Sequence, residues 1–147
     1  MKQFIGMSPS GNLEEAVSGL RSPQFIMLLS NDSQFEAHVA ALERRFPGVP
    51  SIGCIGMSYH VKVIENGVSV IAFSDGVSAA ANVLEQVSTM PVKYIRRLER
   101  DLQAVGGGAQ DTVCIDFCTG NDACALTTIY TALRRRGVSL VGGTGGE

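Results

Sequence analysis

The sequence predicts an α/β fold: a mixed sheet with strand–helix–strand units and an antiparallel hairpin insertion. Two segments, 24–55 and 111–141, each hold a short apolar run, a polar loop, an amphipathic helix and a second apolar run. Strands that are joined through a helix in this way are parallel, and the crossover between them is right-handed. Between the two segments, β-branched runs flank Asn66 and Gly67, and an Asn-Gly pair in that setting is the strongest short signal for a hairpin.

Strands are predicted where short runs of apolar or β-branched residues occur. They cover residues 2–7, 24–29, 49–55, 60–65, 68–73, 111–118 and 138–141. The run 24–29 (QFIMLL) is apolar on both faces, which is typical of a strand buried inside an α/β sheet. In 111–118 the side chains alternate between the two faces, so Cys114, Asp116 and Cys118 share one of them.

The hairpin insertion has a definite expected register. A two-residue turn pairs Glu65 with Val68 and His60 with Phe73 across the ladder. His60 would then hold an ordinary structural place in a cross-strand pair.

Helices are predicted where apolar residues recur every three or four positions. They cover residues 13–20, 34–46, 92–105 and 123–136, and 77–87 is an alanine-rich stretch compatible with a helix. Asn12 suits the N-cap of the first helix, and Gly137 supplies the stop of the last. His38 lies beside the apolar stripe of its helix, which suits a partly buried structural histidine.

Composition limits the classes of function that the chain can have. Its length of 147 residues predicts a single domain over 1–147. With 12 basic and 14 acidic side chains, there is no electrostatic reason to expect nucleic acid or an anionic membrane as a partner. No apolar run reaches the ~18–20 residues of a membrane span, and the N-terminus does not read as a signal peptide. A cytoplasmic location is therefore the expectation.

Familiar catalytic motifs do not occur in the sequence. The run 142–146 (GGTGG) lacks both the GK[ST] ending of a phosphate loop and a following helix. No GxSxG nucleophile motif is present. Cys114, Cys118 and Cys124 form no CxxC pair, and the two histidines are distant in sequence, so buried reduced thiols are expected rather than a zinc site. We therefore expect no enzyme activity.

Small polar residues gather where the predicted parallel strands end. In open α/β sheets, ligands bind outside the carboxyl ends of the strands. Glycines let a ligand approach the backbone, and hydroxyl and amide groups offer uncharged hydrogen bonds. Tight turns need the same residues, so plain turns remain the alternative, and Gly53 can accommodate either a packed helix or a ligand. The candidate ligand-binding residues are Ser30, Asn31, Gly53, Cys54, Thr119, Gly120, Asn121, Gly142, Gly143 and Thr144.

Three stretches in this order resemble the FIST N-terminal (FIST N) domain family. They are 25–31 (FIMLLSN) with its following helix and 45–54 (RFPGVPSIGC), the strand end 70–73 (VIAF), and 116–121 (DFCTGN) with its following helix and 137–147 (GVSLVGGTGGE). The resemblance covers residues 24–147. It departs from the family after Cys54, where Ile55, Gly56 and Met57 replace the usual small polar residues.

The resemblance implies an intracellular, ligand-binding sensory domain of a bacterial signal transduction protein. Its partners would be a small molecule such as an amino acid and a downstream signalling domain or histidine kinase. Because the family domain continues past the glycine run, the resemblance also implies that the chain is an N-terminal fragment of a longer domain. Two alternatives stay open. One is a haem-binding sensor of nitric oxide with His38, His60 or a cysteine as axial ligand. The other is an enzyme that uses the thiolate of Cys54 or Cys118.

Overall fold

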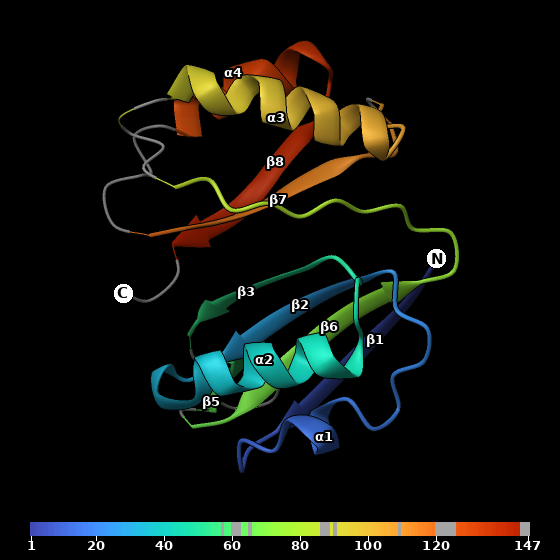
Figure 1. Ribbon diagram of the computed structural model, residues 1–147, viewed down its shortest axis with the longest axis vertical. Helices are drawn as coiled ribbons and strands as arrows, with labels where there is room; N and C mark the ends of the chain where they lie inside the picture. The colour runs from blue at the N-terminus through green and yellow to red at the C-terminus, as the bar shows by residue number, and fades with distance from the viewer. Residues whose placement is uncertain are drawn as a thin grey trace. The chain divides into compact units, whose positions relative to one another are not determined.

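The computed structural model describes residues 1–56, 58–59, 63–64, 66–85, 89, 91–108, 110–119 and 126–144. These residues fall into two compact units, the first over Met1–Ala79 and the second from Ala80 onward. Both units combine helices with strands, so the α/β class is confirmed (Figure 1). The single domain over 1–147 stays a prediction. No helix in the described part of the chain has the length and apolar character that crossing a membrane requires.

The first unit is built on a four-stranded mixed sheet with the order β1-β6-β2-β3. Its strands are β1 (Lys2–Ser8), β2 (Phe25–Ser30), β3 (Ser51–Ile55) and β6 (Val68–Ser74). β2 and β3 are parallel, and α2 (Phe35–Arg45) connects them. This confirms the first predicted strand–helix–strand unit.

One face of this sheet carries the core of the first unit. The short helix α1 (Leu13–Ala16) and α2 lie on this side of the strands (Figure 1). The Asn12 side chain accepts a hydrogen bond from the Glu15 backbone N–H at 3.3 Å, so the expected N-cap is confirmed. The helix is shorter than the predicted 13–20, because Ser18 and Gly19 are poor helix formers. The buried core residues are Leu13, Ala16, Val17, Leu20, Ile26, Leu28, Leu42, Val68, Val70 and Ala72.

The other face of the sheet, here called the open face, receives the alternate side chains of the same strands. Alternation and register assign to it Gln3, Ile5, Met7, Phe25, Met27, Leu29, Ile52, Cys54, Ser69, Ile71 and Phe73. None of these residues is charged. Within the described part of the first unit, the buried side chains of both helices belong to the opposite face.

The predicted pairing of the hairpin is wrong. β6 pairs antiparallel with both β1 and β2, so Val68 lies opposite Ser8 and Ser30 and neither edge of the strand is left for 60–65. β6 is buried along its first half, as a central strand must be. An antiparallel hairpin does occur, but earlier in the sequence, between β4 (Ser58–Tyr59) and β5 (Val63–Ile64). His60 and Glu65 lie outside the described residues.

The second unit holds the second predicted strand–helix–strand arrangement. β7 (Val113–Cys118) and β8 (Ser139–Thr144) are parallel, and α4 (Leu126–Arg135) connects them. α3 (Pro91–Ala104) and α4 cover one side of this strand pair (Figure 1). Their core consists of Tyr94, Ile129, Leu133 and Val138. The helix-compatible stretch 77–87 is not helical over 77–84, and 86–88 lie outside the described residues.

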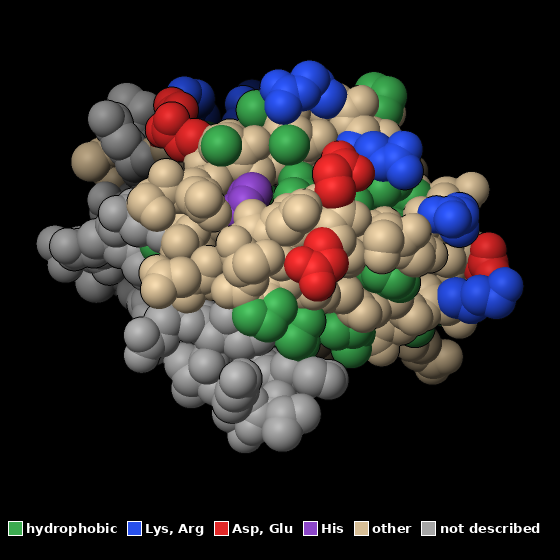
Figure 2. Space-filling view, turned by 90° about the horizontal axis from the view of Figure 1, so that it is seen from below, with side chains coloured by type: hydrophobic (Ala, Val, Ile, Leu, Met, Phe, Trp, Pro, Cys, Tyr) green, Lys and Arg blue, Asp and Glu red, His purple; other side chains and the backbone are tan. Residues whose placement is uncertain are grey.

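Charged side chains do not form a patch of one sign on the face that Figure 2 shows. Basic and acidic groups are interspersed there with apolar and other side chains. This view agrees with the net charge of -2 for the whole chain.

Candidate functional site

The structure divides the candidate ligand-binding residues into two groups. Ser30, Asn31, Gly53 and Cys54 lie at the carboxyl ends of β2 and β3 in the first unit, where Leu29 is the register partner of Cys54. Thr119, Gly142, Gly143 and Thr144 lie at the ends of β7 and β8 in the second unit. Gly120 and Asn121 lie outside the described residues, as does the side chain of Thr144.

Ser30 is fully buried and bonded to a histidine. Its Oγ lies 2.6 Å from Nδ1 of His38, and Nε2 of the same ring lies 2.9 Å from the carbonyl oxygen of Gly11. A carbonyl can only accept, so Nε2 carries a proton, and in the neutral ring Nδ1 accepts from the Ser30 hydroxyl. This confirms the structural role expected for His38. The His38 ring thereby links α2 to β2 and to the turn before α1, and the hydroxyl of Ser30 is committed to this ring.

Asn31 has an enclosed acceptor without a partner. Its Nδ2 donates to Ser33 Oγ at 3.5 Å, but its Oδ1 is shielded from solvent and has no hydrogen-bond partner among the described residues. An enclosed acceptor in this state costs about 1–3 kcal/mol. Buried polar atoms nearly always have a partner, so an unpaired one calls for a donor from outside the protein.

Gly53 lies where the surrounding protein leaves little room for a side chain. A Cβ atom on Gly53 would lie 3.0 Å from the Leu28 carbonyl oxygen and 3.4 Å from the ring of Phe35 on α2. The nearest atoms belong to Leu28 on β2, and Phe35 of α2 comes next, so protein atoms rather than space for a ligand lie at this position. The neighbouring Cys54 is half-buried, and burial raises the pKa of its thiol, so it is a neutral group at physiological pH.

In the second group, Gly142 is required by strand pairing. A Cβ atom there would lie 2.0 Å from the carbonyl oxygen of Asp116, its register partner on β7. For Gly143, no atom of the described residues lies within 4 Å of that position, and its carbonyl accepts from the Cys118 thiol at 3.7 Å. Thr119 is exposed. Among the described residues, this group has no enclosed side-chain polar atom without a partner.

Sequence reasoning missed Ser69 on β6. This side chain is only 8% exposed, and its Oγ has no hydrogen-bond partner among the described residues. The signal in the sequence was a hydroxyl residue at the second position of the apolar strand VSVIAFS, whose other serine, Ser74, is its last residue. Its importance depends on the pairing of β6, which the sequence did not reveal.

His38 does not fit the haem alternative. His38 has both ring nitrogens occupied and is only 6% exposed, so neither nitrogen can reach an iron atom. A cysteine ligand must be a thiolate, and burial raises the pKa of both Cys54 and Cys114. His60 lies outside the described residues. No group of three metal-ligating side chains occurs in the part of the chain that the structure describes.

The thiol of Cys114 makes the free energy of unfolding depend on pH in the alkaline range. Burial, followed by the nearby charges of Asp116 and Asp101, raises the pKa of its thiol from 9.0 to about 11. Because the folded value lies above the unfolded one, the stabilisation is complete below about pH 9 and is lost as the pH rises through 11. We expect the native chain to lose about 2 kcal/mol more than Cys114→Ala between pH 8 and pH 10.5, as measured by urea unfolding. Equal losses in both proteins would contradict this assignment.

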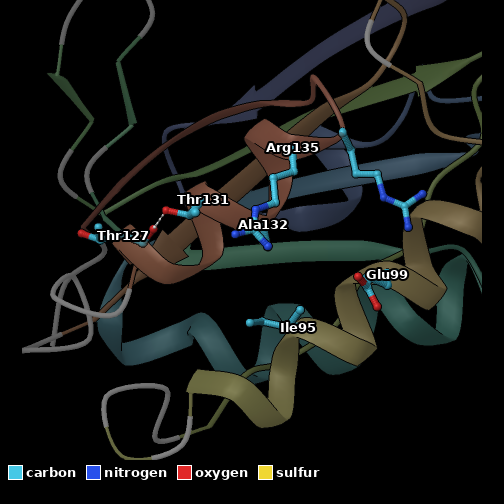
Figure 3. Close-up of a pocket in the computed structure, with 7 residues that line it drawn as sticks. Ile95, Glu99, Thr127, Thr131, Ala132 and Arg135 are labelled. Carbon is cyan, nitrogen blue, oxygen red and sulfur yellow. Dashed lines mark hydrogen bonds between the residues drawn. The ribbon is translucent and has the colours of Figure 1, made fainter.

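A shallow groove lies elsewhere, between α3 and α4. It has a volume of about 390 Å³, and Figure 3 shows Ile95 and Glu99 of α3 facing Thr127, Thr131 and Ala132 of α4 across it. The Thr131 hydroxyl donates to the Thr127 carbonyl at 2.8 Å. The groove contains none of the candidate residues, and no enclosed unpaired polar atom lines it. The carboxyl ends of β2 and β3 are therefore the stronger site.

Comparison with known proteins gives one match. The family model described as FIST N domain matches residues 24–147. No curated protein and no solved structure matches the chain.

Proposed function

Since the chain belongs to the FIST N domain family, a family of sensory domains of signal transduction proteins, we propose that it is a ligand-sensing module whose site includes the carboxyl ends of β2 and β3. The proposal is that a small molecule binds there inside a bacterial cell. The bound state is then read by a downstream signalling domain or a histidine kinase. The module itself carries out no chemistry.

The unpaired Oδ1 of Asn31 is the observation that carries this proposal. The atom is an acceptor only, so the missing partner must be a donor. A ligand that supplies an N–H or O–H group would remove the cost of the enclosed acceptor and gain a hydrogen bond. This site also has the position at which open α/β sheets bind ligands.

The neighbouring groups favour binding over catalysis. The hydroxyl of Ser30 is held by His38 inside the protein, where a substrate cannot reach it. The thiol of Cys54 has a raised pKa, whereas a cysteine nucleophile needs a lowered one. The amide of Asn31 does not titrate and the thiol of Cys54 keeps its proton at neutral pH, so the two groups can bind and orient a molecule but supply neither a general base nor a thiolate.

A thermal-shift screen tests the proposal with amino acids, their uncharged amides and small neutral metabolites. A ligand at about 100 times its dissociation constant adds roughly 2.7 kcal/mol to the free energy of unfolding. We expect Asn31→Ala to leave the ligand-free protein at least as stable and to abolish this shift, because it removes the unpaired acceptor. The matched control is Asn66→Ala, at an exposed asparagine. The proposal fails if no compound stabilises the chain, or if Asn31→Ala responds like the native protein.

A further inference from the structure

A second unpaired atom lies on the same sheet as Asn31. Ser69 is on β6, and alternation directs its side chain to the open face, opposite Val68 and Val70, which the helices cover. Its register partners are Met7 on β1 and Leu29 on β2. Neither offers a strong hydrogen-bonding group, since the methionine sulfur is only a weak acceptor. The enclosed hydroxyl is therefore surrounded by apolar neighbours.

Ser69 and Asn31 both lie near the carboxyl end of β2, since Ser69 is the register partner of Leu29 and Asn31 directly follows Ser30. Asn31 lies two residues beyond Leu29, which is about 7 Å along a strand. Cys54 is the register partner of Leu29 on the other side. A row of side chains therefore crosses the sheet from Ser69 over Leu29 to Cys54, and Asn31 follows at its carboxyl edge. One small molecule over Leu29 can reach both polar atoms.

The chemistry of the open face limits what can lie on it. The face carries no charged side chain, and its other members near Ser69 are apolar. A charged group placed there would lose its hydration without gaining an ionic partner, which costs far more than burying a paired neutral group. A neutral donor group loses little free energy on binding, because hydrogen bonds to Asn31 Oδ1 and Ser69 Oγ replace those that it made with water.

We infer that the ligand of this site is an uncharged molecule with an apolar body and at least one N–H or O–H donor, held by Ser69 Oγ and Asn31 Oδ1 over Leu29. This inference rests on the proposed function and narrows it, because free amino acids carry two charges. It also assigns to Ser69 a ligand-binding role. A serine with no such role would leave the affinity for any ligand unchanged when its hydroxyl is removed.

The test uses indole and phenol as neutral donors, N-methylindole and anisole as counterparts without the donor, and indole-3-acetate and benzoate as charged counterparts. Each is titrated into the full ¹⁵N-labelled chain. We expect indole or phenol to shift the backbone amide signals of Leu29, Asn31 and Ser69. The methylated counterparts should bind roughly tenfold more weakly, as expected for the loss of one hydrogen bond. The charged counterparts should bind at least as weakly, because their carboxylate loses its hydration without gaining an ionic partner.

Variants separate a ligand contact from a structural role. Ser69→Ala should raise the melting temperature of the ligand-free chain, because an unpaired hydroxyl is removed. It should also weaken phenol binding roughly tenfold, because the phenol O–H can donate to Asn31 Oδ1 while its oxygen accepts from Ser69 Oγ. Ser74→Ala, on the same strand but on the other face, is the matched control and should leave that affinity unchanged. Undiminished binding to Ser69→Ala, or tighter binding of the charged compounds, would overturn the inference.

The outcome also distinguishes this inference from the proposed function. If only amino acids bind, and Asn31→Ala abolishes that binding, the inference fails and the sensory proposal stands. If neither the neutral donors nor any compound of the thermal-shift screen binds, both fail.

Discussion

Gly6→Ala is expected to lower the free energy of unfolding by about 3 kcal/mol, the upper end of what overpacking costs. A Cβ atom at Gly6 would lie 1.8 Å from the carbonyl oxygen of Ala16 and 2.8 Å from the ring of Phe4. The closest obstacle is backbone, so no side-chain rotation can relieve the overlap. α1 must move away from β1, which opens the core of the first unit. Urea unfolding at 25 °C measures the loss directly.

Gly56→Ala is the matched control for this substitution. Its Cβ atom would meet no atom of the described part of the chain within 4 Å, and its φ is not positive. We expect a change within about 0.5 kcal/mol, as for most surface substitutions. If Gly6→Ala proves equally harmless, the close packing of α1 on β1 is not present in solution.

His38→Ala is expected to cost about 3 kcal/mol. It leaves the Gly11 carbonyl without this partner, and it leaves the fully buried Ser30 hydroxyl with only the Asn31 carbonyl oxygen, 3.3 Å away. A lost partner costs about 1–3 kcal/mol. It also leaves a cavity between α2 and β2. Ser30→Ala removes only one bond of the network and should cost less, about 1 kcal/mol. Urea unfolding at one fixed pH compares the two variants.

The double variant shows whether these residues act together. Residues in one hydrogen-bond network couple by about 0.5–3 kcal/mol, so we expect the combined loss to fall short of the sum of the two single losses. Glu43→Ala, at an exposed position of the same helix, is the control and should be close to neutral. Strict additivity of His38→Ala and Ser30→Ala would contradict the hydrogen bond between them.

Local sequence signals were sufficient for both strand–helix–strand units. Each needs only a buried run, a loop, an amphipathic helix and a second run, and all four features lie within about 30 residues. The hairpin prediction failed because Val68–Ser74 has strong strand residues but its partners are distant in sequence. An Asn-Gly pair indicates a turn and does not determine which strand lies beside the next one.

For the candidate site, the sequence likewise predicted some features and not others. The residues at the ends of β2 and β3 could be predicted, because topology places strand ends at one edge of the sheet. Their roles could not be predicted. Whether Ser30 faces a histidine, or Gly53 faces Phe35, depends on how α2 packs on the sheet. Ser69 was missed because its enclosure follows from the two strands that flank β6.

The central place of β6 also determines the order in which the chain can be assembled. β1 pairs with nothing in the four-stranded sheet except β6, although Lys2–Ser8 and Val68–Ser74 stand at opposite ends of the first unit. During synthesis, β1 therefore cannot pair until the ribosome has completed β6. Closing so long a loop costs conformational entropy before β1 and β6 form any stabilising contact. Folds that depend on such distant pairings fold slowly. Until then β1 and the β6-facing edge of β2 stay unpaired, and nascent chains are exposed to mispairing with one another.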